Sequence, residues 1–208
     1  MLLFSCQNPL TKAVHKVEYS AYELVGIQKR DLLKTRVDDT RADQKEAGQK
    51  FQDALTQLKA VYQFDGGALE KKYESLKSSY DRASDQARRV HASIQKVQSV
   101  ASDLFDEWAK EIDQIETASL KEKSRESLSQ TKKRFAVLEQ NLKSAERPMD
   151  PVLRKLNDHV LYLKHNLNAK AITSLKGETL KIQGNIEVLI KEMNRSIESA
   201  DQFMRDMN

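Results

Sequence analysis

A strict spacing of apolar residues between Leu69 and Trp108 constrains this chain more than any other feature. Apolar residues follow one another there in alternating steps of four and three. This spacing, about 3.5 residues on average, keeps one apolar stripe on one side of a helix that winds left-handedly around a partner. The positions are Leu69, Tyr73, Leu76, Tyr80, Ala83, Ala87, Val90, Ile94, Val97, Ala101, Leu104 and Trp108. Such a helix cannot bury its stripe alone, so the rest of the chain must supply the facing surface.

Three further stretches carry the same pattern, and each predicts a long helix. Helices are expected over residues 11–62, 119–167 and 169–207, beside a helix over 68–117. Thr40 and Gln44 occupy stripe positions in the first helix, where buried polar residues are predicted to fix the register. In the second helix a step of four from Trp108 to Ile112 breaks the heptad count, which predicts local unwinding.

Few turns interrupt these helices, because the chain has six glycines and three prolines. Phe64-Asp65-Gly66-Gly67 is the clearest turn, since adjacent glycines permit positive φ. A second turn is expected at 117–119, with Ser119 and Glu122 forming a capping box. A third lies at 165–168, with Asn168 capping the last helix.

Pro148 and Pro151 fall inside the third apolar stripe. Each proline removes a helical hydrogen bond and costs about 3 kcal/mol in a helix interior. Asp150 before Pro151 would also suit a helix restart. The stripe crosses both prolines almost undisturbed, so a kink near 147–151 with collinear halves is expected. The predicted fold is all-α: an elongated, antiparallel, coiled-coil-like bundle of about four long helices over residues 10–208, running up-down-up-down.

Charge does not point to nucleic acid as a partner. The net charge of +4 comes from 35 basic and 31 acidic residues, which are interleaved along the chain, whereas phosphate binding needs a concentrated basic face. Residues 118–147 come nearest, and the adjacent Lys132, Lys133 and Arg134 form a candidate basic surface. An ordinary solvated helix face remains the alternative. The acidic stretch 103–116 precedes this region across a turn, so pairing between the two is expected.

Catalytic and metal-binding motifs are not found in the sequence. His159 and His165 lie six residues apart, about 240° around a helix, so they do not share a face. There is no His-Glu-x-x-His, Cys-x-x-Cys, Walker loop or nucleophile elbow, and no Glu-x-x-His of the kind that binds di-iron in bundles. We therefore expect a protein that is not an enzyme and uses no metal or cofactor.

The first nine residues resemble the end of a bacterial lipoprotein signal, in which a cysteine thiol becomes lipidated. Leu3, Ser5 and Cys6 fit the acceptor pattern, while Phe4 is larger than its usual occupant. The charged n-region and most of the apolar h-region of such a signal do not precede the pattern, so residues 1–9 are interpreted as its remnant. Gln7 in place of aspartate favours outer-membrane sorting. A free thiol at Cys6 is the alternative, and this single cysteine can form no internal disulfide.

Several short blocks along the chain are considered together: Leu3 to Cys6, Tyr19 to Gly26, Lys29-Arg30-Asp31, Phe64-Asp65-Gly66-Gly67, Leu104-Phe105-Asp106-Glu107-Trp108, Met149-Asp150-Pro151-Val152-Leu153 and Leu163-Lys164-His165-Asn166-Leu167-Asn168-Ala169. In combination they resemble the domain-of-unknown-function 2959 family, lipoproteins of proteobacteria. The resemblance implies an exported, periplasm-facing protein that is lipidated at Cys6. It implies no catalytic residues.

Two functions follow as hypotheses. The first is a lipid-anchored scaffold or adaptor on the periplasmic face of the outer membrane, whose partners are envelope proteins that the sequence does not identify. The second is a membrane-surface-binding or membrane-shaping helical module, with Lys132, Lys133 and Arg134 as its basic face. Either could act as a homo-oligomer.

Overall fold

The computed structural model describes residues 29–63, 69–166 and 168–207, without the side chains of 169–171 and 173–176. This part of the chain is almost entirely helical and has no strand. Its helices are α2 (Lys29–Tyr62), α3 (Leu69–Gln114), α4 (Ala118–Glu146), α5 (Met149–His165) and α6 (Ala169–Asp206). The fold is therefore the all-α helical bundle that the apolar stripes predict.

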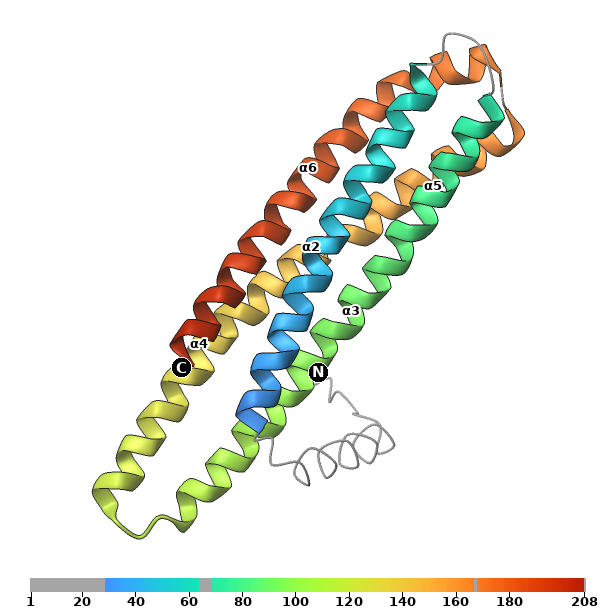
Figure 1. Ribbon diagram of the computed structural model, residues 1–208. Coiled ribbons are helices and arrows are strands. Elements are labelled where there is room, and N and C mark those ends of the chain that lie inside the picture. Colours follow the sequence, from blue (N-terminus) through green and yellow to red (C-terminus); the bar gives the residue numbers. More distant parts are fainter. Residues whose placement is uncertain (1–28, 64–68, 167, 208) are drawn as a thin grey trace, which may run out of the picture.

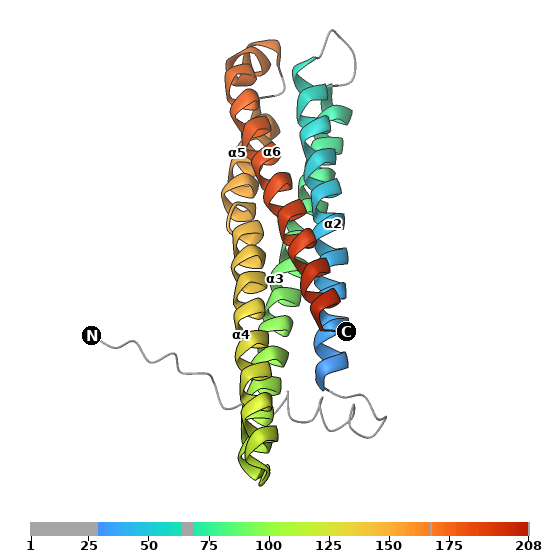
Figure 2. The same ribbon diagram turned by 90° about the vertical axis from the view of Figure 1, so that its left-hand side faces the viewer.

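The helices lie lengthwise and alternate in direction (Figure 1). α2 and α3 form an antiparallel pair, the line of α4 and α5 returns along them, and α6 runs back again. Because α3 has 46 residues, it is about 70 Å long at 1.5 Å per residue. α6 crosses the bundle obliquely, from beside α5 at one end to beside α2 and α4 at the other (Figure 2). The α3–α4 hairpin extends past the first described turn of α2 and the end of α6 (Figure 1).

The apolar stripes predicted for α2 and α6 form the core. Every predicted stripe position of α2 from Leu33 to Val61 is buried, including the polar Thr40 and Gln44. In α6 the described stripe positions from Ile172 to Phe203 are all buried as well, and so is Met207 directly after the helix. α2 thus faces α3 on one side and α6 on another, with its charged residues left in water.

In α3 the break in the heptad count comes earlier than predicted. Ala101 and Phe105 are buried, whereas Leu104 and Trp108, the expected stripe positions, are only partly buried. The extra step of four, which breaks the alternation of fours and threes, therefore falls between Ala101 and Phe105. The cause lies in packing: the Phe105 ring meets Phe135 of α4, with ring centroids 5.5 Å apart, and Phe135 in turn meets Phe203 of α6 at 5.8 Å. Three aromatic rings from three helices fill this level of the core.

The prolines bend the third predicted helix but do not reverse it. Arg147 and Pro148 keep right-handed helical dihedral angles, with φ of −51° and −78°. α4 and α5 consequently follow one another in line (Figure 2), and the buried stripe continues from Ala145 through Met149 to Val152. The predicted kink is confirmed. α5 begins at Met149, so Pro151 lies within its first turn.

The ends of the helices correct one expectation. Ser119 does not cap α4: the helix begins at Ala118, and the carbonyl of Thr117 accepts the amides of Leu120 and Lys121 at 3.0 and 2.9 Å. Thr117 is the N-cap, without a side-chain bond, because the chain turns into the helix two residues earlier than predicted. α6 begins directly after Asn168, as expected. The turn at Phe64-Asp65-Gly66-Gly67, residues 11–28 and Cys6 lie outside the described residues.

Candidate interaction surface

The three basic residues singled out in the sequence lie next to one another on α4 but do not act as one patch. Lys132 and Lys133 are exposed and line a shallow groove together with Arg125, Leu128, Ser129 and Ala136. Arg134 faces another neighbour, because its guanidinium lies 3.8 Å from the carboxylate of Asp206 near the end of α6. The candidate basic surface is therefore narrower than the sequence suggests.

The groove along α4 combines charge with apolar side chains. Its volume is about 440 Å³, and its residues recur every three or four positions, so they share one face of the helix. Lys132 Nζ lies 5.7 Å from the ring centroid of Phe105, a distance at which a cation is attracted to an aromatic face. The ammonium group of Lys132 is thus held beside the aromatic core, while that of Lys133 extends into solvent.

Acidic residues of α3 neutralise part of the α4 charge, as expected. Arg125 lies 3.9 Å from Asp113 and 3.8 Å from Glu122, and Lys121 Nζ donates to the carbonyl of Asp113 at 3.0 Å. Glu107 instead pairs with Lys29 of α2 at 2.8 Å. These pairs are exposed or half-exposed and each contributes little to stability, but they reduce the positive potential at this end of the rod.

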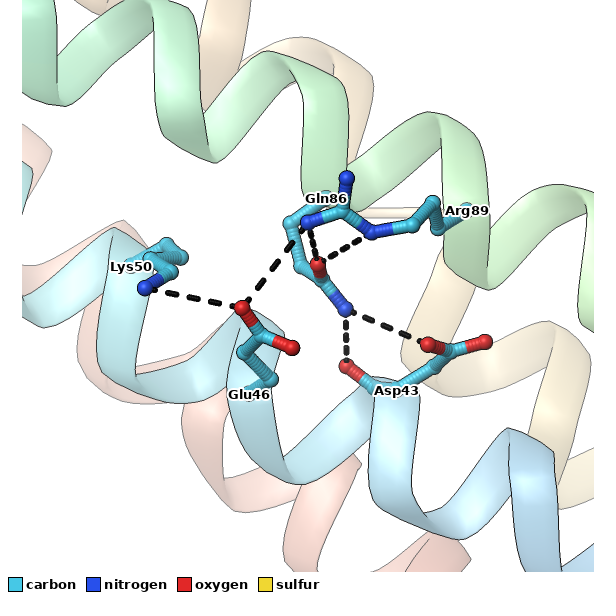
Figure 3. A network of polar contacts seen from close by, with 5 residues as sticks. All are labelled: Asp43, Glu46, Lys50, Gln86 and Arg89. Atoms are coloured by element: carbon cyan, nitrogen blue, oxygen red, sulfur yellow. Dashed lines mark hydrogen bonds and ion pairs between the residues drawn. The ribbon is translucent and has the colours of Figure 1, made fainter.

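A polar network joins α2 to α3 near the middle of the bundle (Figure 3). Gln86 is fully buried and donates to the carbonyl of Asp43 at 2.9 Å. Its amide oxygen accepts from Arg89 Nε at 2.6 Å. Arg89 also lies 3.8 Å from Glu46, which pairs with Lys50 at 3.5 Å. Because both ends of the buried amide are hydrogen-bonded, the network specifies the α2–α3 register at little cost.

Gln44, two residues along α2 from Glu46, is buried without such partners. Neither its amide nitrogen nor its amide oxygen has a hydrogen-bond partner, and the same holds for Ser196 Oγ of α6. Arg41 pairs with Asp201, and a β-carbon at Gly48 would meet Met193 Sδ at 3.7 Å. This antiparallel register places Gln44 and Ser196 in one layer of the core. A buried polar group without a partner is costly, so this layer is a weak point of the bundle.

A buried histidine links α2, α5 and α6 near the end of the rod at which α2 finishes and α5 is followed by α6. The Tyr62 hydroxyl lies 2.5 Å from His159 Nδ1, and the two rings meet edge to face with centroids 5.9 Å apart. Burial lowers the pKa of His159. Burial also raises the pKa of Tyr62 to about 12, and a hydrogen bond from Thr179, which favours the phenolate, partly opposes this rise. Thr179 therefore donates to Tyr62, which donates to the neutral imidazole.

Sequence reasoning missed this cluster, although one signal was present. His159 follows Leu156 by three residues and precedes Leu163 by four, so it lies on the buried face of α5. His165 is exposed, which confirms that the two histidines do not share a face. Nothing in the local sequence indicates that Tyr62, 97 residues away, is the partner.

The described residues form no group of three or more histidine, cysteine or acidic side chains placed to bind a metal ion. None of the described helices combines the length and the apolar composition that crossing a membrane requires. The features that these residues do present are long outer helix faces, shallow grooves and a buried core.

This arrangement defines the class of the protein: an elongated, antiparallel helical bundle. The chain belongs to a family of proteins of unknown function, DUF2959, whose model matches residues 18–207. The resemblance noted from the sequence blocks is thereby confirmed for the family. Cys6 precedes the matched region, so its lipidation stays a prediction. No curated protein matches the chain.

Proposed function

We propose that this protein is a non-enzymatic scaffold or adaptor of the cell envelope, held by a lipid on Cys6 at the periplasmic face of the outer membrane. The observation that supports this role most is the rod itself. One continuous apolar core runs the length of the bundle, so the ends stay far apart while the outer faces remain free. Apolar side chains, including Leu120, Leu161 and Leu180, are exposed along those faces, and the proposal takes them as contact points for other proteins.

The anchor is tested separately from the rod. Cells that make the native protein are fed an alkyne-labelled fatty acid, and the purified protein is examined for label with Cys6 intact and with Cys6→Ala. The proposal expects label on the first and none on the second. Unlabelled protein from the native start site would remove the lipid anchor from the proposal.

The adaptor role is tested by photo-crosslinking in the native cells. A photoreactive residue replaces Leu120 or Leu161, and matched probes replace the exposed Glu74 and Gln130. Envelope proteins captured from the apolar positions, and far less from the polar ones, would support an adaptor. Equal capture from all four positions, or from none, would contradict it.

A membrane-surface-binding module is the second candidate, and the groove on α4 favours it. Arg125, Lys132 and Lys133 surround the apolar Leu128 and Ala136 there, a combination that suits an anionic lipid surface. The paired double change Lys132→Gln and Lys133→Gln should then weaken sedimentation with anionic vesicles. Sedimentation that does not depend on anionic lipid would rule this candidate out.

A further inference from the structure

A second groove opens where the prolines bend the α4–α5 line. Its volume is about 620 Å³, within the range of sites that hold small ligands. Side chains of α4, α5, α6 and the junction between α4 and α5 line it: Ser144, Arg147, Pro148, Pro151, Val152, Lys155, Asn185, Val188, Glu192 and Arg195. Because prolines have no amide hydrogen, the carbonyls of Ser144 and Arg147 lack their usual helical donors four residues on. They remain hydrogen-bond acceptors along this stretch.

This groove carries more cations than acids. Some cations of the bundle pair with nearby acids, as Lys77 does with Asp81 at 2.6 Å and Lys143 with Glu139 at 2.7 Å. Within the described part of the chain, Arg147 and Arg195 make no ion pair or side-chain hydrogen bond. Glu192 is the only acidic residue among the described lining, against Arg147, Lys155 and Arg195. The groove therefore carries an excess of positive charge whose donors are unused.

The helix register puts the two arginines together. Asn141 of α4 donates to Ser199 Oγ of α6 at 3.0 Å, and the helices are antiparallel, so Arg147 and Arg195 lie within about one helical turn along the axis. Lys155 is eight residues further on, about 12 Å away at 1.5 Å per residue. A single anion therefore contacts the arginine end of the groove and not all three cations.

Apolar surface separates the arginines from Lys155. Val152 forms part of the buried floor, and Val188 of α6 is 57% exposed at the same level. Pro151 lies exposed beside them. A ligand that follows this groove needs an anionic head for the guanidinium groups and an apolar part beyond it. Arginines bind phosphate oxygens through two parallel hydrogen bonds, so a phosphate ester fits the head best.

We infer that this kink groove, lined by Arg147, Pro151, Val152, Val188 and Arg195, binds the phosphate head of an anionic phospholipid. The phosphodiester lies between the two arginines, headgroup hydroxyls donate to the carbonyls that the prolines leave free, and the first acyl carbons lie along Val152 and Val188. This site is separate from the groove of Lys132 and Lys133, and it does not depend on a lipid at Cys6.

The test compares two double variants of equal charge change, in the full chain produced without lipid. Arg147→Gln with Arg195→Gln removes the kink-groove cations, and Lys132→Gln with Lys133→Gln removes the α4-groove cations. Binding is measured by flotation with vesicles of phosphatidylcholine alone or with phosphatidylglycerol, and by NMR titration with inorganic phosphate. All four replaced side chains are exposed, so circular dichroism should show unchanged helicity.

The arginine variant should lose roughly tenfold or more of its affinity for phosphatidylglycerol vesicles, and clearly more than the lysine variant. Equal losses would show general attraction to a charged surface and overturn the site. A loss confined to the lysine variant would overturn it and support the membrane-surface candidate instead. Saturable binding of inorganic phosphate with no vesicle binding would reject the lipid, and no binding of either probe would reject the inference altogether.

Discussion

The hydroxyl of Tyr62 and Nδ1 of His159 lie 2.5 Å apart, which ties the last turn of α2 to the buried face of α5. Without this bond the imidazole nitrogen would be a buried acceptor with no donor. Contacts of this kind fix how the α5–α6 end meets the α2–α3 pair.

Tyr62→Phe should lower the free energy of unfolding by about 1–3 kcal/mol, because it leaves His159 Nδ1 buried and unsatisfied. Urea unfolding followed by circular dichroism measures the change. Tyr73→Phe is the matched control, since Tyr73 is also half-buried against the core and no hydrogen bond of its hydroxyl is found in the described structure. An equal loss in both variants would mean that the Tyr62–His159 bond contributes nothing specific.

Stability should fall as the pH drops below about 6.5. Burial lowers the pKa of His159 from its ordinary value of 6.5, against the opposing influence of Glu178 and Asp158. Below pH 6.5 the unfolded chain therefore binds a proton that the folded chain does not, and unfolding becomes easier until the folded-state pKa is passed. His159→Gln should flatten this part of the pH profile, whereas His165→Gln should leave it unchanged. If His159→Gln left the pH profile of stability unchanged, His159 would not be the group responsible for it.

Gln44→Met should raise the free energy of unfolding by about 1 kcal/mol, because it replaces a buried amide without partners by an apolar side chain of similar size. Gln86→Met provides the opposite case. Gln86 is equally buried, but it bonds Asp43 and Arg89, so its replacement should destabilise the bundle by about 1–2 kcal/mol. Urea unfolding of both variants gives the comparison. Stabilisation by Gln86→Met would show that the hydrogen bonds of Gln86 contribute nothing, and destabilisation by Gln44→Met would contradict the cost assigned to its unpaired amide.

Phe135→Ala should be among the most destabilising single changes, at about 3–5 kcal/mol. Its ring touches both Phe105 and Phe203, so its loss opens a cavity between three helices. The exposed Val137 on the same helix is the control, and Val137→Ala should cost less than about 0.5 kcal/mol. Thermal unfolding measures both losses of stability. Similar losses would contradict the claim that the cluster of aromatic rings around Phe135 stabilises this level of the core.

The buried stripe of α2 was predictable because it depends only on the period of a helix, and each position from Leu33 to Val61 follows that period. The kink at Pro148 was predictable for a similar reason, since the local chemistry of proline decides it. The choice of Phe105 over Leu104 was not, because two adjacent apolar residues compete and the facing rings of other helices decide between them.

The candidate sites were harder to predict from the sequence, because tertiary packing decides which side chains come together. Lys132, Lys133 and Arg134 are adjacent in sequence, but Asp206 of α6 takes Arg134 away from the other two. The kink groove joins residues of three helices, and its two arginines are 48 positions apart in the chain. Such sites are fixed by the register of antiparallel helices, which a single sequence does not reveal.

The central claim is that the chain forms an extended helical rod, and small-angle X-ray scattering of the monomer in solution tests it most directly. A bundle about 70 Å long predicts a radius of gyration of about 22 Å or more and a linear cross-sectional region in the scattering curve. A compact sphere-like domain of this length would give about 17 Å and no such region. The first result is the one expected, and the second would contradict the rod and the scaffold role proposed for it.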